Sequence, residues 1–392
     1  MHFSINRNLL CAAIVAGFAC SVSNVVVAAV DDDDVRAVAP NTGWAAQNGG
    51  TTGGAGATAA NTFVVRNKAE LVAALAAGGS LPKIVKIAGQ IDGSEGVPFT
   101  SAADQAARMP IAIPSNTTVI GTTRDARFIN AQITVKNVSN VIIRNIYVQA
   151  PWDDYPVWDP LDGATGNWNS DYDAVQISAA TNVWIDHSTF TDGTRTDDQA
   201  VVVNGKLQQH HDGLLDIVRG SNYVTISYNV FENHSKNMLI GNSDSASTAL
   251  LDRGKLKVTL NNNVFRNVVE RAPRVRFGQV HAYNNYYQGT VDKTTTYPLG
   301  YSLGVGKESA LLSQGNVFDV AGAGNDGCRV VKGYGGTTFK DIGSYLNGSP
   351  LVLGAACTFD PNIGWTPPYT VQELSPGTVK SRALESAGFY KL

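Results

Sequence analysis

Two aspartates in the segment His210-His211-Asp212-Gly213-Leu214-Leu215-Asp216 are the first candidates for chemistry in this sequence. Asp212 and Asp216 lie four residues apart and lead into a β-patterned run at 223–231, so both carboxylates could face one pocket. Unpaired carboxylates in one pocket repel each other, and a hard divalent cation, which prefers several oxygen ligands, would relieve this repulsion. The alternative is that both are solvated loop residues.

A third carboxylate favours the metal site. Asp173 ends an insertion at 150–173 that is rich in Trp and Asp, and it directly precedes the β run 174–177. If successive chain turns stack in register, Asp173 lies beside Asp212 and Asp216, and Asp171 is a candidate fourth ligand. Three or four converging carboxylates indicate a cation site more than chance acidity.

Basic residues follow in the next two turns. Lys236 ends the segment Asn233-His234-Ser235-Lys236, and Arg271, Arg274 and Arg276 lie within six residues. Three neighbouring guanidinium groups repel one another unless an anion is present. Arg274 and Arg276 share a face if this segment is a strand, because side chains alternate with a period of two. A cation site beside an arginine cluster predicts a groove for a polyanion; a solvated basic surface is the alternative.

The elements that must position these residues form a β repeat. A phrase of Asn or a small polar residue, one further residue and then an aromatic recurs from about Lys83 onward, at Asn145, Ser188, Asn229, Asn263, Asn285 and Asn316. The shortest interval, from Asn263 to Asn285, is 22 residues. A β repeat of this period is typical of a stacked solenoid, in which aligned Asn side chains can hydrogen-bond along the stack. A β-sandwich does not explain the recurring phrase.

The rest of the chain predicts a secreted single-domain protein. Residues 1–29 resemble a signal peptide, with Arg7, an apolar stretch at 9–19 and a small-residue cleavage site at 27–29. We expect a flexible lead-in at 30–62 and one catalytic domain at 63–392, capped by a short helix at 67–77. Cleavage would leave Cys328 and Cys357, which we expect to pair in an oxidising compartment. Lipidation at Cys20 is a less favoured alternative.

Composition sets broad limits. The chain has 392 residues, of which 16% are charged, and a formal net charge of -3. This length and apolar content allow a large core and do not indicate disorder. We expect a monomer with neither nucleic acid nor a membrane as partner.

Four motifs together resemble the secreted pectate lyases of polysaccharide lyase family 1. The likeness extends from about Lys83 to the region of Ser381. The motifs are Val183-Trp184-Ile185-Asp186-His187, His211-Asp212-Gly213-Leu214-Leu215-Asp216, Val224-Thr225-Ile226-Ser227 and Arg271-Ala272-Pro273-Arg274-Val275-Arg276-Phe277-Gly278.

The resemblance implies a right-handed parallel β-helix with long loops that form a substrate groove, an extracellular location, and calcium-dependent cleavage of polygalacturonate or low-ester pectin. Asp173, Asp212 and Asp216 fall where the family binds Ca²⁺, with Asp171 as an accessory ligand. Arg271 falls where the family places its proton-abstracting arginine. Lys236 and Arg276, with Arg274, fall where substrate carboxylates bind. One departure is Ser188, which occupies a position where the family usually has Cys.

Arg271 as a base conflicts with the ordinary chemistry of guanidinium, which stays protonated in proteins. It could accept a proton only where neighbouring cations disfavour its charge, most readily at alkaline pH. We therefore expect activity to rise well above pH 7.

Other readings of the same features stay open at this point. A pectin lyase would not need the three aspartates, a polygalacturonase would hydrolyse with paired acids, and a binding solenoid would need no cluster of this kind. His210, His211 and His234 could suggest zinc. Trp152, Trp158 and Trp168 could stack on sugars or pin their loop. We expect a structural role for Asp186 and His187, because adjacent strand residues face opposite sides.

Overall fold

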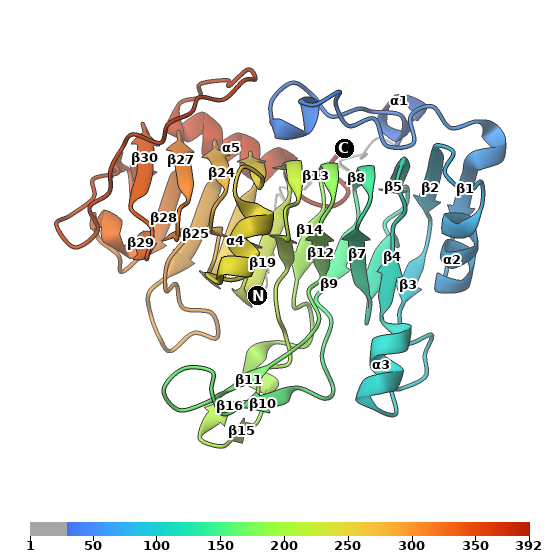
Figure 1. Cartoon of the computed structure of the whole chain (residues 1–392), viewed down its shortest axis with the longest axis horizontal. Helices are drawn as coiled ribbons and strands as arrows, with labels where there is room; N and C mark the ends of the chain where they lie inside the picture. The colour runs from blue at the N-terminus through green and yellow to red at the C-terminus, as the bar shows by residue number, and fades with distance from the viewer. Residues whose placement is uncertain (1–29) are drawn as a thin grey trace, which may run out of the picture.

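The computed structural model describes residues 30–392, which form an elongated rod of stacked coils (Figure 1). The predicted signal peptide, residues 1–29, lies outside the described residues. Within the described part of the chain, no helix is both long enough and apolar enough to cross a lipid bilayer.

Three long sheets run along the rod, and their strands pair in parallel except at β31–β32. The first sheet contains β1 (Thr62–Val65), β2 (Lys83–Ile87), β5 (Thr117–Gly121), β8 (Ser139–Arg144), β13 (Thr181–Asp186), β18 (Asn222–Ser227), β21 (Lys257–Asn261), β24 (Gln279–Tyr283), β27 (Ala310–Gln314) and β30 (Thr338–Ile342). The second contains β4 (Pro110–Ala112), β7 (Gln132–Lys136), β12 (Val175–Ser178), β17 (Leu215–Val218), β20 (Leu239–Ile240), β23 (Arg274–Val275), β26 (Leu303–Gly306) and β29 (Val331–Tyr334). The third contains β3 (Gln90–Asp92), β6 (Arg127–Ile129), β9 (Tyr147–Gln149), β14 (Thr189–Thr191), β19 (Val230–Lys236), β22 (Val264–Glu270), β25 (Tyr286–Thr290), β28 (Val317–Ala321), β31 (Tyr345–Leu346) and β32 (Ser349–Pro350).

Each complete coil, from the one that begins at β2 to the one that begins at β27, contributes one strand to each sheet, so the predicted right-handed parallel β-helix is confirmed. Two antiparallel hairpins project from one side of the rod (Figure 1). They are β10 (Val157–Asp159) with β11 (Asn167–Asn169), and β15 (Val202–Val203) with β16 (Lys206–Leu207).

Helices lie at the ends and on the outside of the rod. The predicted helix at 67–77 is α2 (Lys68–Ala76), which begins where the Asn67 side chain accepts a hydrogen bond from the Glu70 N–H and which packs against the first strands. The others are α1 (Asp32–Val35), α3 (Ala102–Arg108), α4 (Ala246–Asp252), α5 (Pro376–Ser386) and the 3₁₀ turns Trp44–Ala46, Ala59–Asn61, Asp197–Gln199 and Gly327–Arg329.

The Asn positions of the repeat form a buried ladder. The side-chain oxygen of Asn263 accepts from the Asn229 N–H at 2.9 Å, and that of Asn285 accepts from the Asn263 N–H at 3.0 Å. Asn316 continues the ladder in the next coil. The aromatic positions stack beside it, from Phe190 to Phe318, with neighbouring ring centroids 4.4–5.2 Å apart. The repeated phrase therefore sets the register in which every loop of the site is placed.

The segment expected to be a flexible lead-in packs along the outside of the first sheet. Trp44 and Ala45 are buried, and their backbone N–H groups donate to the side chains of Thr259 and Thr225. Outward-facing Trp184 packs against Ala45. The apolar residues on the outer face of this sheet, which would otherwise be exposed, give the segment a surface to cover.

The two cysteines at the C-terminal end are paired as predicted. The Cys328–Cys357 disulfide closes a loop with a sequence separation of 29 residues.

Candidate active site

A cleft of about 530 Å³ lies where the second and third sheets meet, beside the β10–β11 hairpin. Its lining is strongly polar and includes Lys236, Arg271, Arg274, Arg276, Asp212, Glu270, Asp162, Asn167, Asn169, Gln209 and Asn242. Four of the predicted basic residues and one of the predicted aspartates therefore share one cleft.

Asp173 and Asp216 come together through the register of β12 and β17. Val175 pairs with Leu215 and Gln176 with Asp216, which places Asp173 beside Gly213 of the next coil. Asp173 Oδ1 accepts from the Gly213 N–H at 2.9 Å, and Asp216 Oδ1 accepts from the Leu239 N–H at 2.9 Å. A Cβ at Gly213 would lie only 2.6 Å from Asp216 Oδ1 and 2.8 Å from Asp173 Oδ1, so both carboxylates approach the same small space.

The electrostatics of this pair are those of repelling carboxylates. Burial, followed by the charges of Asp216 and Asp212, holds the pKa of Asp173 well above its usual range. Burial, followed by the charge of Asp212, raises the pKa of Asp216 to about 7. Burial and mutual repulsion thus both disfavour the ionised forms of Asp173 and Asp216, and the charge of Arg271 only partly offsets them at Asp216.

Asp212 and Lys236 lie at the edge of this pair, facing the cleft. Lys236 Nζ is 3.9 Å from Asp212 Oδ1, and Lys236 pairs in register with Glu270 of β22. The Lys236 side chain is 15% exposed, whereas that of Asp212 is 34% exposed. The ammonium group therefore lies beside Asp212 at the wall of the cleft.

Arg271 follows directly after β22 and is largely buried. Its Nε lies 3.0 Å from Glu270 Oε1. Burial, the largest single influence, lowers the pKa of Arg271, but the charges of Glu270, Asp216 and Asp212 outweigh it, so the pKa lies above the ordinary value. The carboxylates around it therefore hold the guanidinium in its protonated form.

Arg274 and Arg276 both line the cleft, but different partners hold their side chains. Arg274 lies over the ring of Tyr334, 4.2 Å from its centroid. Arg276 Nε donates to Asp244 Oδ1 at 2.8 Å and its Nη1 donates to the Gly241 carbonyl. Burial and the charge of Arg274 lower the pKa of Arg276, as expected for like charges held close together.

Asp173, Asp212 and Asp216 do not bring three ligand atoms within 4.8 Å of one another in this structure, and Asp171 does not join them. It is exposed, its N–H donates to Asp153 Oδ2, and it is absent from the charges that act on Asp173. A different acidic group lies deeper: one ligand atom from each of Asp192, Asp197 and His211 lies within 4.8 Å of the others, as a metal site would require.

The tryptophans of the insertion pin their loops. Trp152 is 9% exposed and is sandwiched between the His210 ring at 4.1 Å and the Arg195 guanidinium at 4.2 Å. Trp158 and Trp168 pack edge to face at 5.5 Å on the β10–β11 hairpin. Trp152 therefore offers no free face to a sugar ring.

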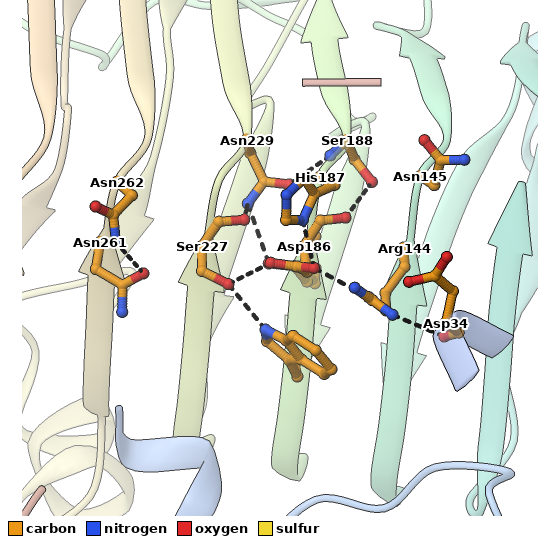
Figure 2. A network of polar contacts seen from close by, with 12 residues as sticks. Asp34, Arg144, Asn145, Asp186, His187, Ser188, Ser227, Asn229, Asn261 and Asn262 are labelled. Carbon is orange, nitrogen blue, oxygen red and sulfur yellow. Dashed lines mark hydrogen bonds and ion pairs between the residues drawn. The ribbon is translucent and has the colours of Figure 1, made fainter. Parts of the chain in front are cut away.

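Asp186 and His187 contact each other, contrary to our expectation that neighbouring strand residues would face apart. His187 has φ of 45°, a left-handed conformation that ends β13 and turns the ring back, so that its Nδ1 lies 2.6 Å from Asp186 Oδ2. Arg144 and Ser227 also bind the Asp186 carboxylate (Figure 2). Arg144 donates in turn to the carbonyl of Asp34, so this network ties the N-terminal segment to the first sheet.

Several cleft residues were not anticipated from the sequence. Glu270 precedes Arg271 directly, but sequence alone does not show that the two side chains pair. Asp162, Asn167 and Asn169 come from the hairpin of the insertion at 150–173 and line the cleft beside the basic residues.

The whole chain is similar to known proteins. A sequence profile described as pectate lyase matches residues 8–392. Pectate lyase A of Dickeya chrysanthemi is 44% identical over 396 residues, which cover 100% of this chain and 98% of that protein.

Two solved structures show the same fold. A mutant of Bacillus subtilis pectate lyase superposes with a TM-score of 0.84 at 37% identity, covering 91% of this chain and 99% of that one. A pectate lyase bound to a hexasaccharide gives a TM-score of 0.83 at 36% identity, covering 94% of this chain and 100% of that one. With a match over nearly its whole length in sequence and in fold, the chain belongs to the pectate lyase family of enzymes.

Proposed function

We propose that the protein is a secreted pectate lyase that cleaves polygalacturonate and low-ester pectin by calcium-assisted β-elimination, giving 4,5-unsaturated oligogalacturonides. The observation that carries this proposal is the convergence of Asp173 and Asp216 at Gly213, with Asp212 beside them and Arg271 and Lys236 at the same cleft. Family membership supports the lyase activity, and a related pectate lyase has a hexasaccharide bound.

The residues present fit a calcium ion. Asp173, Asp212 and Asp216 supply hard oxygen donors, and burial together with the neighbouring carboxylate charges raises the pKa of Asp173 and of Asp216, an effect that a bound cation would oppose. Asp171 would join as an accessory ligand only if its exposed carboxylate turned inward. When bound, calcium would withdraw charge from a substrate carboxylate and make the neighbouring C5 proton more acidic.

Lys236 and Arg276 would bind the substrate carboxylates, and Arg274 would extend the same basic surface. Each of these side chains already lies against a carboxylate or an aromatic ring: Lys236 near Asp212, Arg276 on Asp244 and Arg274 over Tyr334. A uronate carboxylate can replace these partners with charge-assisted hydrogen bonds.

Arg271 would take the C5 proton, after which the C4 oxygen leaves and a double bond forms between C4 and C5. Its guanidinium must first lose a proton, and the carboxylates of Glu270, Asp216 and Asp212 oppose that loss. A cation bound by Asp212 and Asp216 would offset the negative charge of these two carboxylates and so lower the pKa of Arg271. The alkaline activity expected from the sequence rests on the same argument.

The predicted signal peptide supports secretion. We propose that residues 63–392 form one monomeric catalytic domain, on whose first sheet the segment 30–62 packs. Zinc receives no support from the histidines. Both ring nitrogens of His211 and of His234 lie against hydrogen-bond partners in the protein, and His210 contacts the Asp153 carbonyl through Nδ1 and stacks on Trp152.

The test is ultraviolet absorbance of unsaturated product from polygalacturonate, with and without a calcium chelator. The proposal expects absorbance that the chelator abolishes and calcium restores, and a loss of activity when Asp212→Ala and Asp216→Ala are combined. Activity retained on fully esterified pectin with chelator would favour a pectin lyase, and sugar release without absorbance would favour a hydrolase. No reaction at all would favour a binding solenoid.

A further inference from the structure

A buried hydrogen-bond network lies behind the cleft and is centred on His234 of β19. The side chain of His234 is fully buried. Its Nδ1 lies 2.5 Å from Asp192 Oδ1, and its Nε2 lies 2.8 Å from the Asp212 carbonyl oxygen and 3.2 Å from that of Lys236. Because these carbonyl oxygens can only accept, Nε2 must carry a proton and donate it.

Asp192 is held on its other side by a loop that follows β25. The Tyr297 hydroxyl donates to Asp192 Oδ2 at 2.5 Å and accepts from the Asp197 N–H at 3.0 Å. Asp192 is 0% exposed, so both of its oxygens are used within the protein. A fully satisfied buried network of this kind is rigid and fixes the groups at its ends.

The spacing of Asp192, Asp197 and His211 does not make this network a metal site. His211 Nδ1 lies 2.9 Å from the Pro151 carbonyl oxygen, and His211 Nε2 lies 2.7 Å from that of Arg195. Neither ring nitrogen is then free to bind a cation. Asp192 likewise already accepts from Tyr297 and contacts His234.

The far end of the network is a single peptide group at the candidate calcium site. The Asp212 carbonyl that accepts from His234 and the Gly213 N–H that donates to Asp173 Oδ1 at 2.9 Å belong to the same peptide bond. A peptide group is planar, so its carbonyl and N–H cannot turn independently. His234 and Asp173 therefore hold opposite ends of one rigid plane.

We propose that His234 is a positioning residue that sets the orientation of the Asp212–Gly213 peptide plane, and through it the carboxylates of Asp173 and Asp212, for a divalent cation. The proposal rests on the proposed function, because calcium is the cation concerned. Asp192 and Tyr297 hold the imidazole in place, so the loops around 192–199 and 291–297 act on the cleft without lining the calcium site. Lys236 is coupled to the same plane through its carbonyl.

His234→Asn and His234→Gln separate the two ends of the imidazole. An Asn amide reaches only toward Asp192, whereas a Gln amide can still donate near the position of Nε2. Calcium binding is measured by isothermal titration calorimetry without substrate. We expect the calcium Kd of His234→Asn to rise about 10–100-fold, as for other partners that orient metal ligands, and His234→Gln to recover part of the loss.

His281→Asn is the matched control, because His281 of β24 is also fully buried but contacts Tyr369 of the C-terminal segment. It is expected to lower the melting temperature and to leave the calcium Kd unchanged. Tyr297→Phe, a milder change, is expected to raise the calcium Kd several-fold and serves if His234→Asn does not fold.

The outcomes are distinct. If the wild-type enzyme binds no calcium, the proposed function fails whatever the variants do. If the wild type binds calcium, two results overturn the positioning role of His234 while the lyase assignment stands. The first is that Tyr297→Phe and the folded His234 variants bind calcium as tightly as the wild type does. The second is that His281→Asn loses calcium affinity to the same extent as the His234 variants.

Discussion

Oxygen atoms of Asp173 and Asp216 share the space that a side chain at position 213 would occupy, because Gly213 has no Cβ to keep them apart. The two aspartates come from different coils, and the register of β12 and β17 brings them together. The need for glycine here comes from the carboxylates, since their oxygens would be the atoms closest to a Cβ at this position.

Gly213→Ala should therefore weaken calcium binding. The added methyl would lie 2.6 Å from Asp216 Oδ1 and 2.8 Å from Asp173 Oδ1, so both carboxylates would have to turn away from the cation position. We expect the calcium Kd to rise by about tenfold or more, as when metal-ligand orientation is disturbed. Gly377→Ala, where nothing lies within 4 Å of the new methyl, is the control. Equal calcium affinity in both variants would contradict the expectation.

Asp216→Asn should stabilise the calcium-free enzyme at alkaline pH. The pKa of Asp216 is raised from 3.8 to about 7 by burial and by Asp212, so the folded state binds its proton more tightly than the unfolded state. The stability that this group contributes is fully present below about pH 4 and is lost as the pH rises through about 7. Asn keeps the acceptor for the Leu239 N–H without the charge.

Thermal unfolding in chelator at pH 8 is the measurement for this variant. Asp216→Asn should melt above the wild type there, with the difference disappearing near pH 4. Added calcium should raise the melting temperature of the wild type only. Asp125→Asn, at an exposed position, is the control. A lower melting temperature for Asp216→Asn than for the wild type, in chelator at pH 8, would show that the ionised Asp216 carboxylate does not destabilise the fold.

Glu270→Gln should shift the pH–rate profile to lower pH. The Glu270 charge raises the pKa of Arg271, from which its carboxylate lies 3.0 Å away. Removing that charge makes the neutral guanidine easier to form, so a base at Arg271 becomes active at lower pH. The measurement is kcat/KM against pH at saturating calcium.

Glu308→Gln is the matched control, because Glu308 forms an exposed ion pair with Arg253. Its profile should coincide with that of the wild type. An unshifted profile in Glu270→Gln would argue that Arg271 is not the titrating base.

Sequence reasoning went furthest where one residue type repeats. The spacing of the Asn phrase was enough to predict the coil and its Asn ladder, because in a solenoid the repeat period determines the position of each residue. It failed where a single backbone dihedral angle, or a segment distant in the sequence, decides which side chains are in contact. The left-handed turn at His187 and the covering of Trp184 by Ala45 leave no periodic signal.

The His234 network shows the same limit at the site. Sequence placed His234 two residues before Lys236, but Asp192 and Tyr297 are separated from it by 42 and 63 residues, and only the folded coils bring them together. Residues that orient ligands are harder to recognise than the ligands, since their chemistry depends on burial and direction.

Asn263→Ala should lower stability without changing turnover by the folded enzyme. The Asn263 side chain donates to the Ile226 carbonyl and to Asn285 Oδ1, both at 2.9 Å, and accepts from the Asn229 N–H at 2.9 Å. Truncation leaves buried groups of neighbouring coils unpaired, at a cost of about 1–3 kcal/mol for each. In a protein of this size the melting temperature should fall by several degrees. Asn362→Ala, at an exposed position, should melt like the wild type. Because the ladder sets the register of every coil, a loss of kcat in folded Asn263→Ala would mean that register strain reaches the cleft, whereas unchanged kcat would show that adjacent coils hold the site by themselves.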